Sequence, residues 1–196
     1  MNKREKNWEG TEAYERLVDA VVATVHEYGY AGATMDRIAQ KAGYTRGAIQ
    51  HYFGNRRVDL MSRVTSELLS SRQKKYEARF NIETAPPLVT SRDGLKAAFR
   101  EPETWFLIEV WIASKGDPEL HSRISQLQDK VEKLSDAMLE ISARNFTSTS
   151  FRVLKAYLRS LTRGLALEYS RRPDPALFDD VVDLAFDALE ALDRKI

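Results

Sequence analysis

Two short segments between residues 34 and 53 carry the residues that start and stop helices. Thr34 and Thr45 each precede a run of helix-compatible residues, where a hydroxyl side chain caps the first backbone N–H groups of a helix. Gly43 lies between the two runs, and glycine readily takes the left-handed conformation that ends a helix. The pattern predicts a helix up to Ala42, a turn at Gly43 and a second helix up to Phe53.

These two helices meet the requirements of a helix-turn-helix. Ala39 is small where the helices cross, Gly43 suits the turn, and Ile49 with Phe53 provides an inward apolar face. The remaining face of the second helix carries Arg, Gln and His side chains. In the major groove of DNA, arginine pairs with guanine and glutamine with adenine, while hydroxyl and imidazole groups bind phosphates. We therefore predict a recognition helix at about residues 45–53.

The rest of the chain shows helical periodicity and no competing strand pattern, so we predict an all-α fold. Apolar residues recur every three or four positions from Thr11 to Tyr28, and a long helix follows from Arg56. Pro86 and Pro87 interrupt that helix before residue 88, because consecutive prolines do not fit a helix interior. Further helices are expected at about 103–115, 118–143, 148–171 and 175–192. We divide the chain into an N-terminal DNA-binding domain, 1–58, and a larger helical domain, 59–196.

Composition excludes several classes of protein. The 196 residues are 43% hydrophobic and 30% charged, which is typical of a globular chain, and the net charge is only +1. The chain contains no cysteine, so disulfides, thiolate metal sites and thiol nucleophiles are excluded. No run approaches the ~18 apolar residues of a membrane helix, and the polar start has no signal-peptide core. We expect a cytoplasmic protein without a membrane partner, cofactor or metal.

The segment from about Thr11 to Leu60 resembles the tetracycline-repressor (TetR) family of transcriptional regulators. The resemblance is carried by the run from Thr34 to Phe53, which ends in His51-Tyr52-Phe53, and by the following Asn55-Arg56-Arg57-Val58-Asp59-Leu60. The chain departs from the family pattern at Gln50, where tyrosine is frequent, and at Tyr44, where a small aliphatic residue is commoner. Both departures lie on the predicted DNA face, so they affect which operator is read rather than the fold.

The resemblance implies a role in DNA binding for residues on this face. We expect phosphate contacts from Thr34, Thr45, His51, Tyr52 and Arg56 or Arg57, and base contacts or close approach from Tyr44, Arg46, Gly47, Ala48 and Gln50. The expected partner is double-stranded operator DNA. The expected function is that of a ligand-responsive regulator, most simply a repressor that a small-molecule effector releases from its operator.

The C-terminal half is expected to form a homodimer and to bind the effector. A single helix-turn-helix reads few base pairs, so two copies spanning two half-sites are needed, and the resemblance implies that the last two helices form the interface. We expect a small apolar or aromatic effector to bind in a pocket of this half. The candidate lining residues, which could equally be ordinary core residues, are Trp105, Phe106, Glu109, Trp111, Phe146, Phe151, Tyr157 and Tyr169. Basic residues on one face of 148–171 and acidic residues on one face of 175–192 are complementary in charge. Two hypotheses stay open: the two faces pair with each other, or each is solvated independently.

Two alternatives belong to other classes of protein. One is a helical homodimeric ligand-binding or scaffold module without DNA binding. The other is a magnesium-dependent isoprenoid-type enzyme, because the spacing of Asp179, Asp180 and Asp183 matches an Asp-rich metal motif. The chain lacks a second such motif, and acidic residues near a helix start also suit the helix dipole. We therefore expect no enzyme activity.

Overall fold

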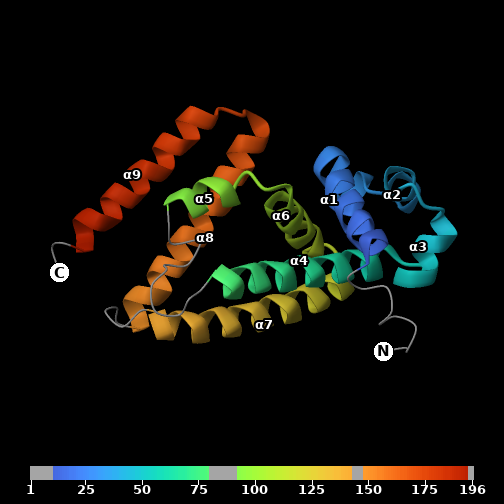
Figure 1. Ribbon diagram of the computed structural model, residues 1–196, viewed down its shortest axis with the longest axis horizontal. Helices are drawn as coiled ribbons and strands as arrows, with labels where there is room; N and C mark the ends of the chain where they lie inside the picture. The colour runs from blue at the N-terminus through green and yellow to red at the C-terminus, as the bar shows by residue number, and fades with distance from the viewer. Residues whose placement is uncertain (1–10, 80–91, 143–147, 194–196) are drawn as a thin grey trace. The chain divides into compact units, whose positions relative to one another are not determined.

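The computed structural model describes residues 11–79, 92–142 and 148–193, and every regular element in these ranges is an α-helix (Figure 1). The helices are α1 Glu12–Gly32, α2 Met35–Ala42, α3 Arg46–Phe53, α4 Arg57–Arg79, α5 Arg92–Ala98, α6 Pro102–Ser114, α7 Pro118–Ser142, α8 Ser148–Arg171 and α9 Pro175–Asp193. The predicted all-α fold is confirmed. Across the described ranges, no helix has the length and apolar character needed to cross a membrane.

The chain packs as two compact units. The first unit consists of Met1–Arg72 and Phe106–Glu132, and the second of Gln73–Trp105 and Lys133–Ile196. Helices α4, α6 and α7 therefore contribute residues to both units. This division describes packing, so the functional boundary predicted after residue 58 stays a prediction.

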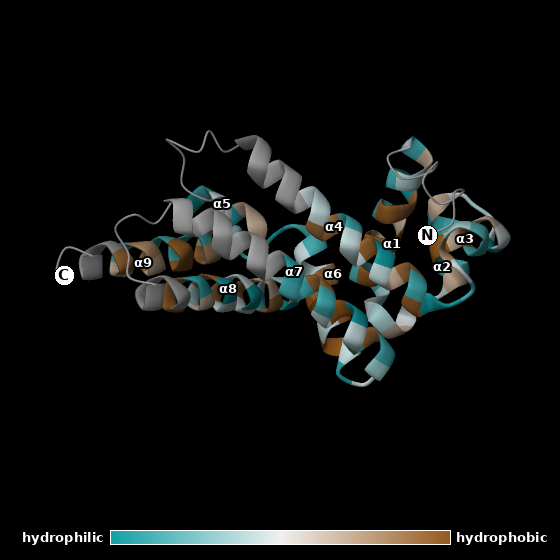
Figure 2. Cartoon of the chain, turned by 90° about the horizontal axis from the view of Figure 1, so that it is seen from below, coloured by the Kyte–Doolittle hydropathy of each residue, from teal (hydrophilic) through white to brown (hydrophobic). Residues whose placement is uncertain are grey.

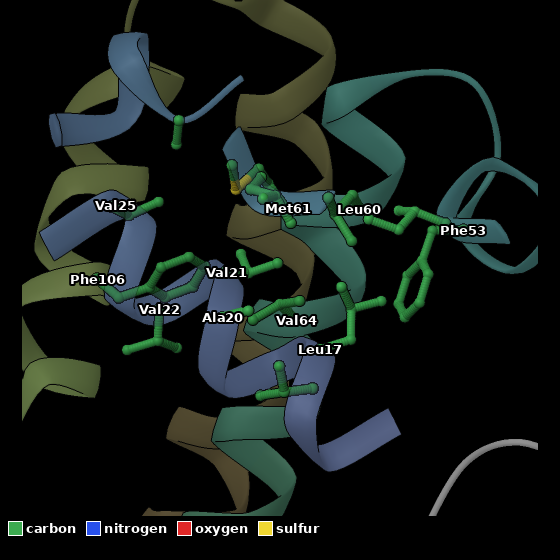
Figure 3. Packing of buried hydrophobic residues seen from close by; sticks show 14 of the residues in the cluster. Leu17, Ala20, Val21, Val22, Val25, Phe53, Leu60, Met61, Val64 and Phe106 are labelled. Atoms are coloured by element: carbon green, nitrogen blue, oxygen red, sulfur yellow. The ribbon is translucent and has the colours of Figure 1, made fainter. Parts of the chain in front are cut away.

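The core of the first unit joins the predicted helix-turn-helix to parts of α4, α6 and α7. Leu17 and Val21 of α1, Ile38 of α2, Ile49 of α3 and Phe106 of α6 are fully buried in one apolar cluster. Figure 3 shows the Phe106 ring pointing toward α1, beside Val21 and Val22. Burying a large apolar side chain contributes about 1.5–3 kcal/mol to the free energy of folding. This cluster therefore stabilises the packing of α1, α2 and α3 against α4, α6 and α7.

Helix α1 ends in a kink that two distant residues stabilise. Gly29 has φ +69°, which a side chain would strain, and the chain then makes one further helical turn to Gly32. The backbone N–H of Tyr30 donates to Oε2 of Glu109 over 3.1 Å. The Arg57 guanidinium donates to the carbonyls of Tyr30 and Ala31 over 3.3 and 3.2 Å. The apolar periodicity from Thr11 to Tyr28 therefore leads up to a kink at Gly29, and the helix ends only at Gly32.

The second unit contains a short helix that the sequence did not predict. Helix α5 packs along α9, and Phe99 just after α5 meets the rings of Tyr169 and Phe178 at centroid distances of 5.5 and 6.0 Å. Such edge-to-face and tilted contacts are favourable for aromatic rings. The cluster therefore ties α5 to the hairpin of α8 and α9.

A ladder of ion pairs also connects α5 with α9. Arg92 and Lys96 of α5 and Arg100, two residues after its end, face three acids at four-residue spacing on α9: Arg92 with Asp187 at 2.5 Å, Lys96 with Asp183 at 2.8 Å, and Arg100 with Asp179 at 2.7 Å. We considered the basic residues of α8 as the partners of these acids, whereas these three pairs are made with α5 and with Arg100 just after it. We predicted no helix at residues 92–98, so we did not consider the positive charges of this segment as partners of the α9 acids.

Candidate DNA-binding site

The first helix of the predicted motif has the expected caps. The Thr34 hydroxyl accepts a hydrogen bond from the N–H of Arg37 over 3.3 Å, which caps α2. Gly43 ends α2 with φ +72° and ψ 26°, and its N–H donates to carbonyls of the last turn. This left-handed conformation is strained for residues with a side chain, so the turn requires glycine.

The second helix presents one face to the core and the opposite face to solvent. The Thr45 hydroxyl caps α3 by accepting from the N–H of Ala48 over 3.1 Å. Ile49 and Phe53 are buried, and the Phe53 ring stacks on Tyr14 at a centroid distance of 5.7 Å. These two residues anchor α3 in the core, and Arg46, Gly47 and His51 are exposed to solvent.

None of the residues predicted to bind DNA is buried. Their side chains fall into an exposed group, Thr34, Thr45, Arg46, Gly47, His51 and Arg56, and a half-buried group, Tyr44, Ala48, Gln50, Tyr52 and Arg57. All of these residues are therefore at least partly accessible, although Tyr44 and Tyr52 also pack against the apolar core. Their individual roles on DNA stay predictions.

Contacts within the first unit distinguish the two arginines after Asn55. Arg56 is exposed and pairs with Glu119 of α7, and this hydrogen bond is the main cause that lowers the pKa of Glu119 below its ordinary value. Arg57 lies over the Tyr30 ring at 4.5 Å and donates to two carbonyls at the end of α1. Arg57 therefore has a structural role in holding α4 against α1.

An open hollow of about 800 Å³ lies at the C-terminal end of α3. Residues 50–54 line it together with residues of α4 and α7, which are Asp59, Ser62, Arg63, Ser66, Arg123, Gln126, Leu127 and Lys130. Its three cations exceed its one acid, so the hollow has a positive character next to His51. The sequence did not indicate the α7 residues, because only the packing of α7 against α4 brings them to α3.

The residues predicted to line an effector pocket are divided between the two units. Phe106 lies fully buried in the core of the first unit, where Glu109 accepts from the Tyr30 N–H and Trp111 lies beside Lys115. In the second unit, Tyr169 belongs to the aromatic cluster, Trp105 is half-buried and Tyr157 is 42% exposed. Phe146 and the side chain of Phe151 lie outside the described residues. The pocket stays a prediction.

Two of the three acids in the suspected metal motif form ion pairs. Asp179 and Asp183 pair with Arg100 and Lys96. The hydrogen bond from Lys96 is the main cause that lowers the pKa of Asp183 below its ordinary value. Within the ranges that the structure describes, no group of three or more histidines and acids is placed to hold a metal ion.

Comparison with known families assigns the helix-turn-helix segment. Residues 17–58 match the family described as "Bacterial regulatory proteins, tetR family". The chain is 30% identical over 130 residues to the protein described as "Uncharacterized HTH-type transcriptional regulator TtgW" of Pseudomonas putida, covering 62% of this chain and 90% of TtgW. It is 25% identical over 187 residues to the HTH-type transcriptional regulator BetI of Pectobacterium carotovorum subsp. carotovorum, covering 90% of this chain and 91% of BetI.

The fold also matches solved structures. A TetR transcription regulator from Haloarcula marismortui superposes with a TM-score of 0.67 at 19% identity, over 92% of this chain and 97% of that chain. At this identity the likeness concerns the fold. The family match ends at residue 58, and the fold similarity extends beyond it to most of the remaining helices.

Proposed function

The chain belongs to the tetR family of bacterial regulatory proteins and is a helix-turn-helix transcriptional regulator, and on this basis we propose that it is a homodimeric repressor released from its operator by a small molecule. One observation carries the DNA-binding part of the proposal. Helix α3 is anchored by Ile49 and Phe53, while Arg46, Gly47 and His51 on its other face are exposed. A capped helix with a polar outer face suits the major groove.

The residues of this surface have separate roles in the proposal. Arg46 and Gln50 contact base edges, and the absent side chain of Gly47 allows the helix backbone to approach the DNA. The exposed hydroxyls of Thr34 and Thr45 bind phosphates at the N-terminal ends of α2 and α3, where backbone N–H groups and the helix dipole favour an anion. The operator is therefore read by α3 and positioned by both helices.

Binding to the DNA upstream of the protein's own gene tests this proposal. Fluorescence anisotropy with a duplex from that region should show an affinity that falls steeply between about 50 and 200 mM salt, because each phosphate contact releases counterions. Arg46→Ala should weaken binding. Arg171→Ala is the matched control, because Arg171 is an exposed arginine of α8 that pairs with Glu168. Binding without salt dependence, or equal loss in both variants, would favour the module without DNA binding.

The dimer proposal is supported by apolar side chains that α8 and α9 leave exposed. On α8 these are Val153, Tyr157 and Leu167, with exposed fractions of 65%, 42% and 49%. Their spacing places them on one helix face, opposite the buried Leu158 and Leu165. Figure 2 shows apolar residues (brown) alternating with polar ones (teal) along both helices.

Gly164 lies in the same face of α8 and supports close packing there. Apart from the adjoining turns of its own helix, no described atom would lie within 4 Å of a Cβ at Gly164, so the space beside it is open. On α9, Leu177 and Leu184 are 55% and 70% exposed at a spacing of seven residues. Two such hairpins related by a twofold axis form a four-helix bundle with a buried apolar interface.

We assign the effector to the second unit, as a small apolar or aromatic compound. TetR-family regulators bind small molecules as well as operator DNA, and aromatic residues such as Trp105 and Tyr169 suit an apolar ligand. The compound would favour a dimer geometry in which the two α3 helices no longer match successive major grooves. A ligand that raises the thermal midpoint and releases the operator in the same concentration range would support this assignment. As a regulator of genes, the protein would act in the cytoplasm.

A further inference from the structure

Arg46 stands where the electrostatics of its own helix are unfavourable. It is the first residue of α3, and the first turn of α3 contains no acidic residue. The N-terminal end of a helix carries a partial positive charge, which disfavours a cation. A compensating negative charge is therefore expected from elsewhere in the molecule.

Asp36 provides that charge from the neighbouring helix. It lies in the first turn of α2, and its Oδ1 and Oδ2 atoms are 3.3 and 3.4 Å from Nη1 of Arg46. Both side chains are more than half exposed, at 55% for Arg46 and 73% for Asp36. The pair thus links the two helices of the motif on the surface predicted to face DNA.

The geometry allows Arg46 to contact a base while it stays paired. A guanidinium has five N–H donors in a planar fork, and guanine accepts two of them, at O6 and N7. Both contacts with Asp36 use Nη1. The Nη2 side of the fork can therefore reach guanine while the carboxylate restrains the side chain.

We propose that Asp36 is a positioning residue that determines the sequence specificity of Arg46. This inference rests on the proposed function as a DNA-binding regulator. Two effects act in the same direction. The ion pair restricts the orientations of Arg46, which lowers the entropy cost of a specific base contact. The Asp36 carboxylate also repels phosphates when Arg46 is not docked on its base, which weakens non-specific binding.

The expected size of the effect follows from the exposure of the pair. Solvent screens an exposed ion pair, so the gain in specificity is modest, about two- to fivefold in the ratio of specific to non-specific affinity. Loss of the Arg46 base contact itself should cost more, about tenfold or above. Asp36 variants should therefore weaken the preference at one base pair of each half-site without removing it.

A selection from duplex DNA with a randomised centre about two helical turns long measures this preference directly. We compare wild type with Asp36→Asn, which removes the charge, Asp36→Glu, which keeps it, and Arg46→Ala. The control is Asp129→Asn, because Asp129 is an acid of α7 outside the motif and its substitution changes the net charge equally. Affinities for selected and mixed-sequence duplexes are then measured at one salt concentration, and thermal midpoints report folding.

The proposal expects Asp36→Asn to bind mixed-sequence DNA more tightly and to lose preference at the base pair that Arg46→Ala also affects. Asp36→Glu should restore most of that preference, and Asp129→Asn should behave as wild type. Equal changes on all sequences, the same effect in Asp129→Asn, or loss at a different base pair would overturn the role of Asp36. If wild type enriches no sequence at all, the DNA-binding function itself fails, which is a separate result. If Asp36→Asn lowers the thermal midpoint, Asp36→Ser, which also removes the charge, takes its place in the comparison.

Discussion

Leu184 offers a quantitative test of the dimer interface. It is the most exposed large apolar residue of α9, at 70%. Leu184→Ala removes about three methylene equivalents at about 0.8 kcal/mol each, and the exposed fraction reduces this to about 1.7 kcal/mol of burial per copy. A twofold interface contains the residue twice, so the dimer loses about 3.4 kcal/mol, or roughly 300-fold in its dissociation constant.

Sedimentation equilibrium over a concentration series measures that constant. Alanine is a good helix former and Leu184 makes few contacts in the monomer, so the thermal midpoint of a dilute sample should change little. Ile112→Ala is the control, because Ile112 is an apolar residue of α6 in the first unit with 51% exposure. A dissociation constant within about threefold of wild type would refute the assignment of α9 to the interface. Equal weakening by Ile112→Ala would show that the change is not specific to that surface.

Three further predictions concern the recognition helix and the ion-pair ladder. Gln50→Ala should change which operator variants bind, whereas His51→Ala should weaken all of them about equally; a uniform loss in both, measured at fixed salt, would contradict the base contact of Gln50. Gly47→Ala should raise the free energy of unfolding by about 0.5–1 kcal/mol, because glycine is unfavourable inside a helix, and should lower DNA affinity by blocking close approach; unchanged affinity would remove Gly47 from the interface. The hydrogen bond from Lys96 lowers the pKa of Asp183, so its contribution to stability is present at neutral pH and is lost as the pH falls through that lowered value. Asp183→Asn should therefore flatten the acid side of the stability curve below about pH 4, and an unchanged slope in acid-dependent unfolding would show that the pair contributes nothing.

Local signals were sufficient to predict most of the fold. Threonine caps and Gly43 define α2 and α3 within one residue, because a cap acts on the backbone N–H groups of its own first turn. Proline at the first helical position likewise gives the starts of α7 and α9 at Pro118 and Pro175. Each of these signals depends on neighbours within four residues, so the sequence contains all the information needed.

Helix α5 was not predicted, because its stability depends on residues that are distant in the sequence. Its seven residues are too few to be stable on their own, since a short isolated helix rarely forms in water. Its stability comes from buried Leu95 and from ion pairs with acids that follow about ninety residues later in the chain. The extra turn of α1 after Gly29 has the same origin, because Glu109 and Arg57 satisfy its backbone groups from other helices.

The same distinction applies to the candidate site. The outward face of α3 follows from the periodicity that buries Ile49 and Phe53, so its exposed residues could be predicted. The partners of those residues could not, because the pairing of Arg46 with Asp36 depends on how α2 and α3 cross. The positive hollow beside His51 likewise depends on the placement of α7.

Hydrogen bonds within the protein determine which arginines near α3 are able to bind DNA. The Nη1 group of Arg57 already donates to two backbone carbonyls, and leaving those carbonyls unpaired would cost free energy. The partners that the structure gives Arg46 and Arg56 are carboxylates on the exposed surface. A phosphate or guanine can replace or join such a partner at small cost, since exposed ion pairs are weak. The phosphate contact predicted for Arg56 or Arg57 is therefore better assigned to Arg56, with Arg57 holding the start of α4 against the end of α1.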